Sequence, residues 1–231
     1  MIPIGDDNVT IRFPLMTYAL LAAIAVAWFF VQGAGFDHYV LVSSVCNLGL
    51  VPGEITGQAP IGEAVPISPG LACVVDNDPV NPWTPLTSMF LHGGWGHILG
   101  NCLFLWVFGN NVEDAMGRLR FLLFYLICGL AAAFAQVVVH PGSAVPMVGA
   151  SGAISGVMGG YLVLFPHARV RCVWWLFIFI TFVRLPAWLM LAIWFGSQFL
   201  IPKGAGIAAM AHVGGFVAGL ILVKLFARRP R

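Results

Sequence analysis

Long apolar stretches that are almost free of charged residues recur along the whole chain. A helix of about 20 predominantly apolar residues is long enough to cross the roughly 30 Å hydrocarbon core of a bilayer. Apolar residues make up 60% of the chain and charged residues only 9%, which is unlike an ordinary soluble domain. The pattern predicts an all-α polytopic membrane protein with one domain over residues 1–231. Six transmembrane helices are expected at 14–32, 94–112, 121–139, 150–166, 185–201 and 206–226.

The segments between these stretches differ in length and polarity. Residues 1–12 are short and polar, whereas residues 33–91 form a long connection rich in Gly, Pro and Asp that is too polar to cross the membrane. The apolar run 172–183 is cut from the next stretch by Arg184-Leu-Pro186, and we interpret it as interfacial or as the lead-in to the fifth span. The first apolar stretch is too long for a signal-peptide core, so we expect it to be retained.

Lysine and arginine fall on one side of the expected bundle, and such residues collect on the cytoplasmic side of membrane proteins. The 33–91 connection contains neither, and Lys203 is the exception to the pattern. We therefore expect cytoplasmic termini and an outer loop at 33–91. A bacterial inner membrane fits best, because no mitochondrial-type presequence is present. The residues on the expected cytoplasmic side are Arg12, Arg118, Arg120, Arg169, Arg171, Arg184, Lys224, Arg228, Arg229 and Arg231.

Two of the five cysteines, Cys46 and Cys73, lie in the expected outer loop. A disulfide there would close a loop of about 28 residues and stabilise the fold by roughly 3 kcal/mol in the chain-entropy model. Two unpaired cysteines are the alternative, and the sequence leaves both open. Cys102, Cys128 and Cys172 lie in or beside apolar stretches and are interpreted as small apolar fillers.

The sequence offers no pattern for a metal, a cofactor or a nucleic acid. It has no Cys-x-x-Cys pair and no His-Glu-x-x-His stretch. His92 and His97 are five residues apart, about 140° around a helix, which is a poor geometry for a metal pair. The formal net charge is only +2, and no basic aromatic patch is present, so no nucleic-acid partner is expected.

A glycine-rich, uncharged segment from Met147 to Gly160 carries Ser151 near its head. A helix from Ser151 to Phe165 would be about 22 Å long, too short to cross the hydrocarbon core, so we expect Ser151 to lie inside the membrane. A hydroxyl at a helix N-terminus faces free N–H groups and the positive dipole end, which suits a reaction that develops an oxyanion. The alternative is a structural serine bonded to its own helix backbone.

Small residues recur every four positions in two of the expected helices. Such faces let helix backbones approach closely. His212 stands beside the second face, so packing of the two faces would bring its imidazole within hydrogen-bond reach of Ser151. A serine beside a histidine is a nucleophile with its general base. The small residues are Gly152, Gly156 and Gly160 in the first helix and Ala211, Gly215 and Gly219 in the second.

The expected pair lacks the carboxylate of a triad. Glu113 and Asp114 are the only acids in a span-like stretch, and they lie at the cytoplasmic end of the second span, far from an outer-leaflet serine. We therefore expect a Ser–His dyad whose histidine is oriented by packing. The segment around Ser151 is not the elbow of soluble hydrolases, because Ala153 stands where that elbow needs glycine.

His97 and Asn101 are spaced i, i+4 on the second expected span and share one face. Both side chains can donate hydrogen bonds, and with the backbone N–H of Ser151 they would form an oxyanion hole. The alternative is two ordinary polar contacts between helices, each worth about 0.6 kcal/mol.

Three segments carry a family resemblance: His92-Gly-Gly-Trp-Gly-His97-Ile-Leu-Gly-Asn101, Gly149-Ala-Ser151-Gly152 and Ala211-His212-Val-Gly-Gly215-Phe-Val-Ala-Gly219. In this order they resemble the rhomboid intramembrane serine proteases, and the likeness extends from the first span to the last. The resemblance implies a six-helix rhomboid-like bundle with Ser151 as nucleophile and His212 as base. It also implies His97 and Asn101 as oxyanion stabilisers and a structural role for Glu113.

Two positions depart from the family pattern. The outer loop has Trp83-Thr84 where the family usually has Trp-Arg, so the contribution of the arginine is absent or replaced. Ser155 stands where an aromatic residue often stacks on the catalytic histidine, one turn after the serine. The second departure leaves the fine positioning of His212 open.

The expected function is a serine endopeptidase that cleaves single-span membrane proteins within the lipid bilayer, near the outer face. A catalytically silent relative that binds membrane proteins for quality control is the alternative. A transporter that uses buried histidines is disfavoured because the sequence shows no inverted repeat with broken helices. The physiological substrate, the cleavage preference and the oligomeric state stay open.

Overall fold

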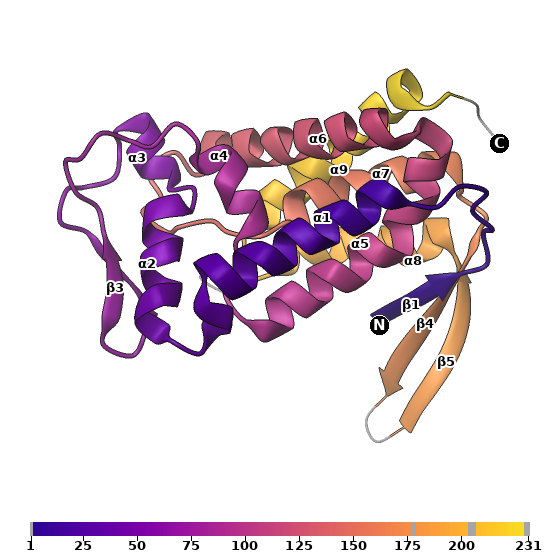
Figure 1. Cartoon of the computed structure of the whole chain (residues 1–231), viewed down its shortest axis with the longest axis horizontal. Helices are drawn as coiled ribbons and strands as arrows, with labels where there is room; N and C mark the ends of the chain where they lie inside the picture. The colour runs from indigo at the N-terminus through magenta and orange to yellow at the C-terminus, as the bar shows by residue number, and fades with distance from the viewer. Residues whose placement is uncertain (1, 177–178, 203–206, 229–231) are drawn as a thin grey trace.

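A computed structural model describes residues 2–176, 179–202 and 207–228. Its body is a bundle of helices that lie roughly along the long axis of the molecule (Figure 1). Judged by length and composition, α6 and α9 are the two described helices that are long and apolar enough to cross a membrane. The principal helices are α1 (Leu15–Val26, extended by η1 at Ala27–Val31), α5 (Trp95–Met116), α6 (Arg118–Val139), α7 (Ser151–Leu164), α8 (Ala187–Gln198) and α9 (Ala209–Phe226).

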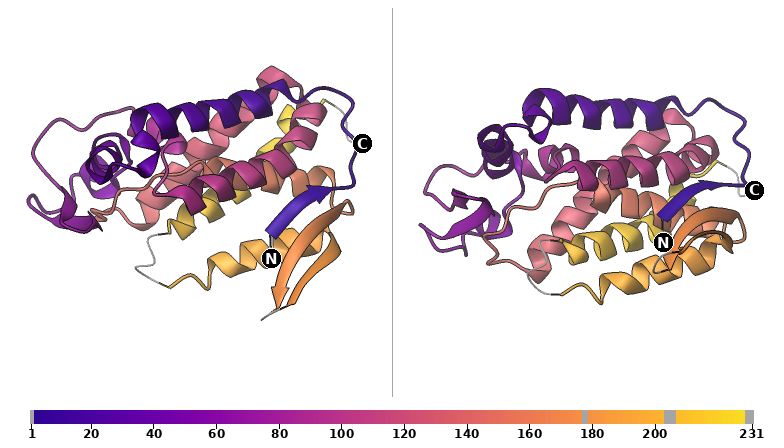
Figure 2. Two further views of the ribbon diagram at one scale, coloured as in Figure 1. Left: turned by 60° about the horizontal axis from the view of Figure 1, so that its bottom comes forward. Right: turned by 90° about the horizontal axis from the view of Figure 1, so that it is seen from below.

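Helix α7 lies in the interior of this bundle, whereas α1 and α8 lie on opposite sides of it (Figure 2). Every residue of α7 from Gly152 to Tyr161 is buried. The helix begins at Ser151, as the sequence predicts, and its 14 residues span about 21 Å. The interior of the bundle therefore holds a helix whose N-terminus carries the serine.

Glycines bring α7 and α9 into backbone contact. A Cβ atom added at Gly215 would lie 2.0 Å from the carbonyl oxygen of Gly152, and one at Gly219 would lie 2.0 Å from that of Gly156. A real side chain cannot occupy either position without separating the helices. The close approach predicted from the four-residue repeats is confirmed.

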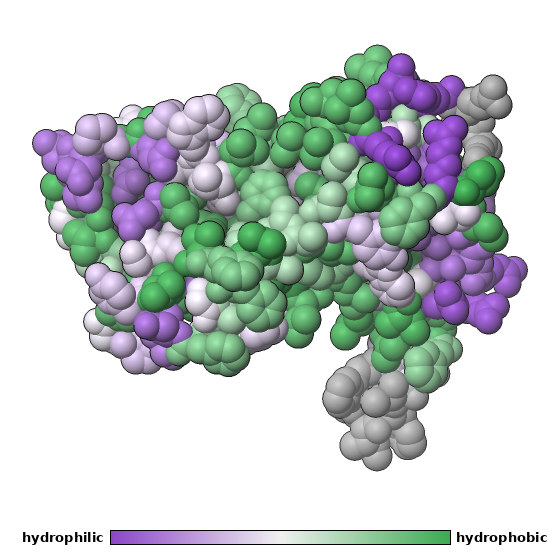
Figure 3. Space-filling model, viewed as in Figure 1, coloured by the Kyte–Doolittle hydropathy of each residue, from purple (hydrophilic) through white to green (hydrophobic). Residues whose placement is uncertain are grey.

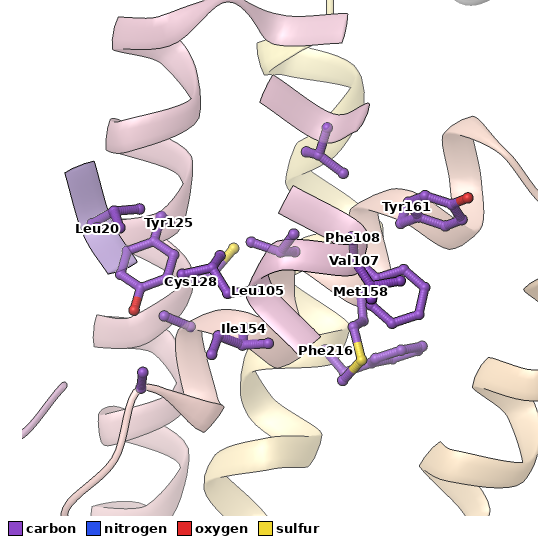
Figure 4. Packing of buried hydrophobic residues seen from close by; sticks show 14 of the residues in the cluster. Leu20, Leu105, Val107, Phe108, Tyr125, Cys128, Ile154, Met158, Tyr161 and Phe216 are labelled. Atoms are coloured by element: carbon purple, nitrogen blue, oxygen red, sulfur yellow. The ribbon is translucent and has the colours of Figure 1, made fainter. Parts of the chain in front are cut away.

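Aromatic and aliphatic side chains from several helices fill the rest of the core (Figure 4). Phe108 of α5 and Tyr161 of α7 are fully buried, with ring centroids 5.0 Å apart in an edge-on arrangement. Tyr125 of α6 is likewise fully buried. The labelled side chains in Figure 4 come from α1, α5, α6, α7 and α9, so one continuous core joins these helices.

The expectation of an all-α fold is wrong in two places. Residues 169–176 and 179–186 form an antiparallel strand pair, whereas the sequence predicts an interfacial segment or a lead-in to the fifth span over 172–183, of which 177 and 178 lie outside the described residues. The run is rich in β-branched and aromatic residues, which favour strands, and the distant N-terminal segment supplies a third strand. The sheet has the order β1-β4-β5, with β1 (Ile2–Asp6), β4 (Arg169–Leu176) and β5 (Phe179–Pro186).

The second place is the 33–91 connection, which is not merely an irregular loop. A disulfide joins Cys46 at the end of one of its helices to Cys73 in one of its strands, which resolves the alternative that the sequence leaves open. Asp37 caps the first helix by accepting the N–H of Tyr39 at 2.8 Å. The elements here are η2 (Gly33–Gly35), α2 (His38–Leu48), α3 (Pro52–Thr56), β2 (Ala64–Ser68), β3 (Leu71–Val74), α4 (Thr84–Thr87) and η3 (Ser88–Phe90).

Hydrophobic residues cover the middle of the face seen in Figure 3, and hydrophilic residues gather at both ends. At one end, Arg12, Arg118 and Arg228 line the same hollow. Asp7 pairs at the neighbouring sheet with Arg171 and Arg184, at 3.7 and 3.8 Å. Basic residues from distant parts of the chain thus meet at one end of the bundle. Lys203, Arg229 and Arg231, which also enter the charge argument, lie outside the described residues.

Glu113 ties α5 to the start of α1. Its carboxylate accepts the N–H groups of Met16 and Thr17 at 2.9 and 2.7 Å and the hydroxyl of Thr17 at 2.8 Å. These are first-turn N–H groups, which have no acceptor within their own helix. Glu113 therefore acts as a cap supplied by another helix.

Asp6 anchors the N-terminal strand to the bundle. It accepts hydrogen bonds from the Tyr161 hydroxyl and, at 2.8 Å, from Nδ2 of Asn111. Burial raises the pKa of Asp6, and the hydrogen bonds oppose that shift only in part. Strand β1 is consequently held to both α5 and α7.

Candidate active site

A turn around Gly149 precedes Ser151, which is the first residue of α7. Gly149 has φ +129°, a conformation that side chains disfavour, and its N–H donates to Ser88 O at 2.8 Å. A Cβ atom there would lie 2.7 Å from Nε2 of His97 and 3.4 Å from Oγ of Ser151. Glycine at this position therefore lets three groups converge: the turn backbone, the imidazole of His97 and the Ser151 hydroxyl.

Ser151 and His212 are hydrogen-bonded, with 2.8 Å between Oγ of the serine and Nε2 of the histidine. His212 lies in the first turn of α9, and Ser151 begins α7. The glycine contacts between these two helices bring the residues together from positions 61 apart in the sequence. Both side chains are only partly buried, because they line a cavity.

The other nitrogen of His212 contacts a residue that the sequence analysis missed. Nδ1 lies 2.7 Å from Oε1 of Gln198, the last residue of α8. The expectation that packing alone orients the histidine was therefore incomplete. A signal was present, because Gln198 is a polar residue inside a predicted span and such residues are functional candidates.

Trp194, one turn before Gln198, supplies an aromatic neighbour for His212. The two ring centroids are 5.9 Å apart, with an interplanar angle of 40°. Ser155, which departs from the family pattern, is fully buried and donates its hydroxyl to Ser151 O at 2.6 Å. The aromatic contact thus comes from α8 instead of α7. The other departure, Thr84, donates its hydroxyl to Asn81 O at 3.1 Å within its own loop.

His97 and Asn101 of α5 line the same cavity as Ser151 and His212, with a volume of about 430 Å³. Nδ1 of His97 accepts the Gly93 N–H at 3.3 Å, so a neutral His97 carries its proton on Nε2, the nitrogen that faces Gly149. Nδ2 of Asn101 is buried and has no hydrogen-bond partner within the described chain. His97 and Asn101 thus lie in the wall of the cavity that Ser151 also lines, and each carries a potential hydrogen-bond donor.

Among the described residues, no group of three His, Cys, Asp or Glu side chains could hold a metal ion. His92 is fully buried and packs edge-on against His97, with ring centroids 5.0 Å apart. The arrangement is suited instead to chemistry by a hydroxyl, an imidazole and hydrogen-bond donors. Such a set can activate a nucleophile and stabilise a developing oxyanion.

Comparison with known proteins gives the family. Residues 79–229, more than half of the chain, match the Rhomboid domain. Rhomboid protease GluP of Bacillus subtilis is 44% identical over 80 residues, which cover 35% of this chain and 15% of that protein. RHOMBOID-like protein 4 of Arabidopsis thaliana is 32% identical over 150 residues, which cover 64% of this chain and 35% of that protein. The mitochondrial Rhomboid protein 1 of Saccharomyces cerevisiae is 30% identical over 139 residues, which cover 58% of this chain and 33% of that protein.

The chain belongs to the rhomboid family of helical polytopic membrane proteins. The matched part spans between 15% and 35% of the length of these three relatives. The resemblance found in the three sequence segments is therefore confirmed at the level of the family and of its integral membrane location.

Proposed function

We propose that this protein is an intramembrane serine endopeptidase that hydrolyses peptide bonds in or near the transmembrane segments of single-span membrane proteins. The observation that carries the proposal is the 2.8 Å hydrogen bond between Ser151 and His212 at the head of a buried helix. Membership in the rhomboid family, which includes proteins named as proteases, supports the same reaction. A neutral imidazole at this distance can accept the hydroxyl proton as the serine attacks.

In the proposed reaction, Oγ of Ser151 bonds to the carbonyl carbon of the substrate while Nε2 of His212 takes the proton. The C–N bond of the tetrahedral intermediate then breaks, and His212 returns the proton to the leaving amine. Water, deprotonated by His212, attacks the resulting ester and releases the new carboxyl terminus. The Ser151 hydroxyl recovers its proton from His212, so the cycle uses no cofactor.

His97 and Asn101 are the proposed oxyanion stabilisers, together with the Ser151 N–H. The unpartnered Nδ2 of Asn101 and the Nε2–H expected on His97 support this role. Donors already in place stabilise the charge that develops in the transition state, and removing one such donor typically costs about 100- to 1000-fold in kcat.

For the membrane topology we propose that α1 with η1, α5, α6, α7, α8 and α9 are the six spans of a single domain, 1–231. Both termini would be cytoplasmic and the 33–91 loop would lie outside, in a bacterial inner membrane. Arg12, Arg118 and Arg228 share one end of the bundle, which supports this orientation. Because α7 spans only about 21 Å, its N-terminus would lie below the outer surface of the hydrocarbon core.

A serine-reactive phosphonate probe tests the nucleophile. The native protein in detergent should be labelled, and Ser151→Ala should not. Ser155→Ala is the matched control, because Ser155 lies on the same helix with its hydroxyl bonded to the backbone. Undiminished labelling of Ser151→Ala would contradict the assignment.

Cleavage of a single-span test protein separates the enzyme from a catalytically silent rhomboid-like binding protein. We expect cleavage by the native chain and none by His212→Ala. If the native chain binds the test protein without cutting it and also resists the phosphonate probe, the silent alternative is correct.

A further inference from the structure

The side chain of Gln198 is held from both sides in a partly polar corner where α8 approaches α9. Its Oε1 lies 2.7 Å from Nδ1 of His212. Its Nε2 donates to the backbone carbonyl of Trp194 at 2.9 Å and lies 3.2 Å from Oγ of Ser197. The residue is only 5% exposed, so these protein contacts stand in place of water.

These contacts determine which way the amide of Gln198 points. A backbone carbonyl oxygen can only accept, so the group facing Trp194 O must be the NH₂. The amide oxygen therefore faces His212. Exchanging the two ends would set the amide oxygen of Gln198 against the carbonyl oxygen of Trp194, two acceptors with no proton between them, and would lose the hydrogen bond from Nε2.

The orientation of the amide in turn determines which nitrogen of His212 carries the proton. An amide oxygen can only accept, so Nδ1 of His212 must be the N–H donor. In a neutral imidazole the other nitrogen, Nε2, is then unprotonated. That nitrogen lies 2.8 Å from Oγ of Ser151, where it can accept the hydroxyl proton.

We propose that Gln198 is a positioning residue for the proposed reaction: it holds His212 as the Nδ1–H tautomer and directs Nε2 at the Ser151 hydroxyl. The site is thus a nucleophile, a base and a neutral orienting group on α7, α9 and α8, instead of a dyad held by packing. Oε1 continues to accept from Nδ1–H when His212 is protonated, so Gln198 also stabilises the imidazolium formed during the reaction. This inference rests on the proposed protease function.

The kinetic test compares Gln198→Leu and Gln198→Glu with the native enzyme on the same single-span test protein. Gln198→Leu removes the acceptor at similar volume, and we expect kcat to fall about 10- to 100-fold with little change in KM. Gly196→Ala is the matched control two residues away, because a Cβ atom added at Gly196 meets nothing within 4 Å and every contact of Gln198 stays intact. We expect it to change kcat less than about twofold.

The pH–activity profile separates orientation from a purely structural role. The groups that face His212 are Ser151 from α7, Gln198 and Trp194 from α8, and the titratable His97 from α5. Gln198→Glu places an anionic acceptor at Nδ1, which favours the imidazolium, so the acid limb should move to higher pH. Gln198→Leu should move it to lower pH. A role limited to packing α8 predicts the native acid limb in Gln198→Leu.

A measurement that needs no activity completes the test. With ¹⁵N-labelled histidine, the native protein should show His212 protonated at Nδ1, whereas Gln198→Leu should lose that preference. A native His212 protonated at Nε2, or a Gln198→Leu variant with the native kcat and tautomer, would overturn the inference. Failure of the protease proposal is distinct, because the native chain would then neither cleave nor react with the phosphonate.

Discussion

Helices α7 and α8 both contact α9 and both reach His212, but they do so with different parts of the chain. On the α7 side, glycines put backbone against backbone, with a Cβ position at Gly215 only 2.0 Å from Gly152 O. On the α8 side, the contact is made by side chains, with the rings of Phe195 and Phe216 4.7 Å apart. The outer face of α8 carries exposed apolar side chains, such as Ile193 at 52% exposure.

The difference shows how two requirements of the same site are met. Where backbone packs against backbone, no side chain can rotate to change the separation of the helices. The distance between Ser151 and His212 is therefore set by the positions of the axes of α7 and α9. Side-chain contact can be rearranged by rotating a few bonds, and it supplies the finer property, the direction and protonation of the imidazole. We therefore expect substitutions at the first interface to affect folding, and substitutions at the second to affect rate.

The largest effect is expected when the backbone contact is broken. Gly215→Val places three carbons where the Gly152 carbonyl lies, so α7 and α9 must separate. We expect a loss of several kcal/mol in the free energy of unfolding, above the roughly 1–3 kcal/mol typical of overpacking, with activity abolished. Thermal unfolding in detergent measures the first quantity, and cleavage of the test protein measures the second.

Gly196→Ala on α8 is the matched control, because an added Cβ there meets nothing within 4 Å. Alanine favours a helix over glycine by about 1 kcal/mol, so this variant should be as stable as the native protein or slightly more stable. Equal destabilisation by both substitutions would show that the loss at Gly215 does not come from its contact with Gly152.

A disulfide outside both helix interfaces provides a scale for the comparison. Replacing Cys46 and Cys73 together by serine removes the disulfide that joins α2 to β3. We expect the free energy of unfolding to fall by roughly 3 kcal/mol, because the loop gains freedom in the unfolded state. Cleavage at a temperature where the variant stays folded should be nearly unchanged. A matching loss of kcat there would mean that the 33–91 connection positions the site.

A smaller effect is expected from the aromatic contact of α8. Trp194→Leu removes the ring beside His212 and keeps an apolar side chain in its place. An aromatic contact is worth about 0.5–1.5 kcal/mol, so we expect kcat to fall about three- to tenfold. The thermal midpoint should move less than in Gly215→Val. A larger shift in the midpoint than in kcat would place Trp194 among the structural residues instead.

The smallest effect is expected on the pH dependence of stability, at Asp6 of strand β1, which is hydrogen-bonded to Tyr161 near the C-terminal end of α7. The pKa of Asp6 is raised by burial, so the folded state binds its proton more tightly than the unfolded state does. The stability that this proton contributes is present at acid pH and is lost as the pH rises above the ordinary range of an aspartate. Asp6→Asn should flatten this part of the curve of unfolding free energy against pH. An unchanged slope would show that Asp6 does not contribute to it.

Local periodicity made the helical part of the site predictable. The four-residue spacing of small residues places them on one face of each helix, so the sequence predicts two faces that can pack closely, and Gly152 and Gly215 meet between them. The same holds for the start of α7 at Ser151, where a turn glycine precedes a long apolar run. The pairing of β4 with β1 had no such signal, because its partner strand lies more than 160 residues away.

The sequence by itself determined the membrane class and the family, and it singled out Ser151 and His212 because burial in lipid makes a polar residue costly and therefore rare. The sequence reasoning nevertheless missed Gln198. Only the tertiary structure decided which polar residues touch. The contact of Gln198 with His212 depends on where α8 ends relative to α9, and no spacing along the chain specifies the relative position of two packed helices. That position results from the whole of the packing, including an N-terminal strand far from the site.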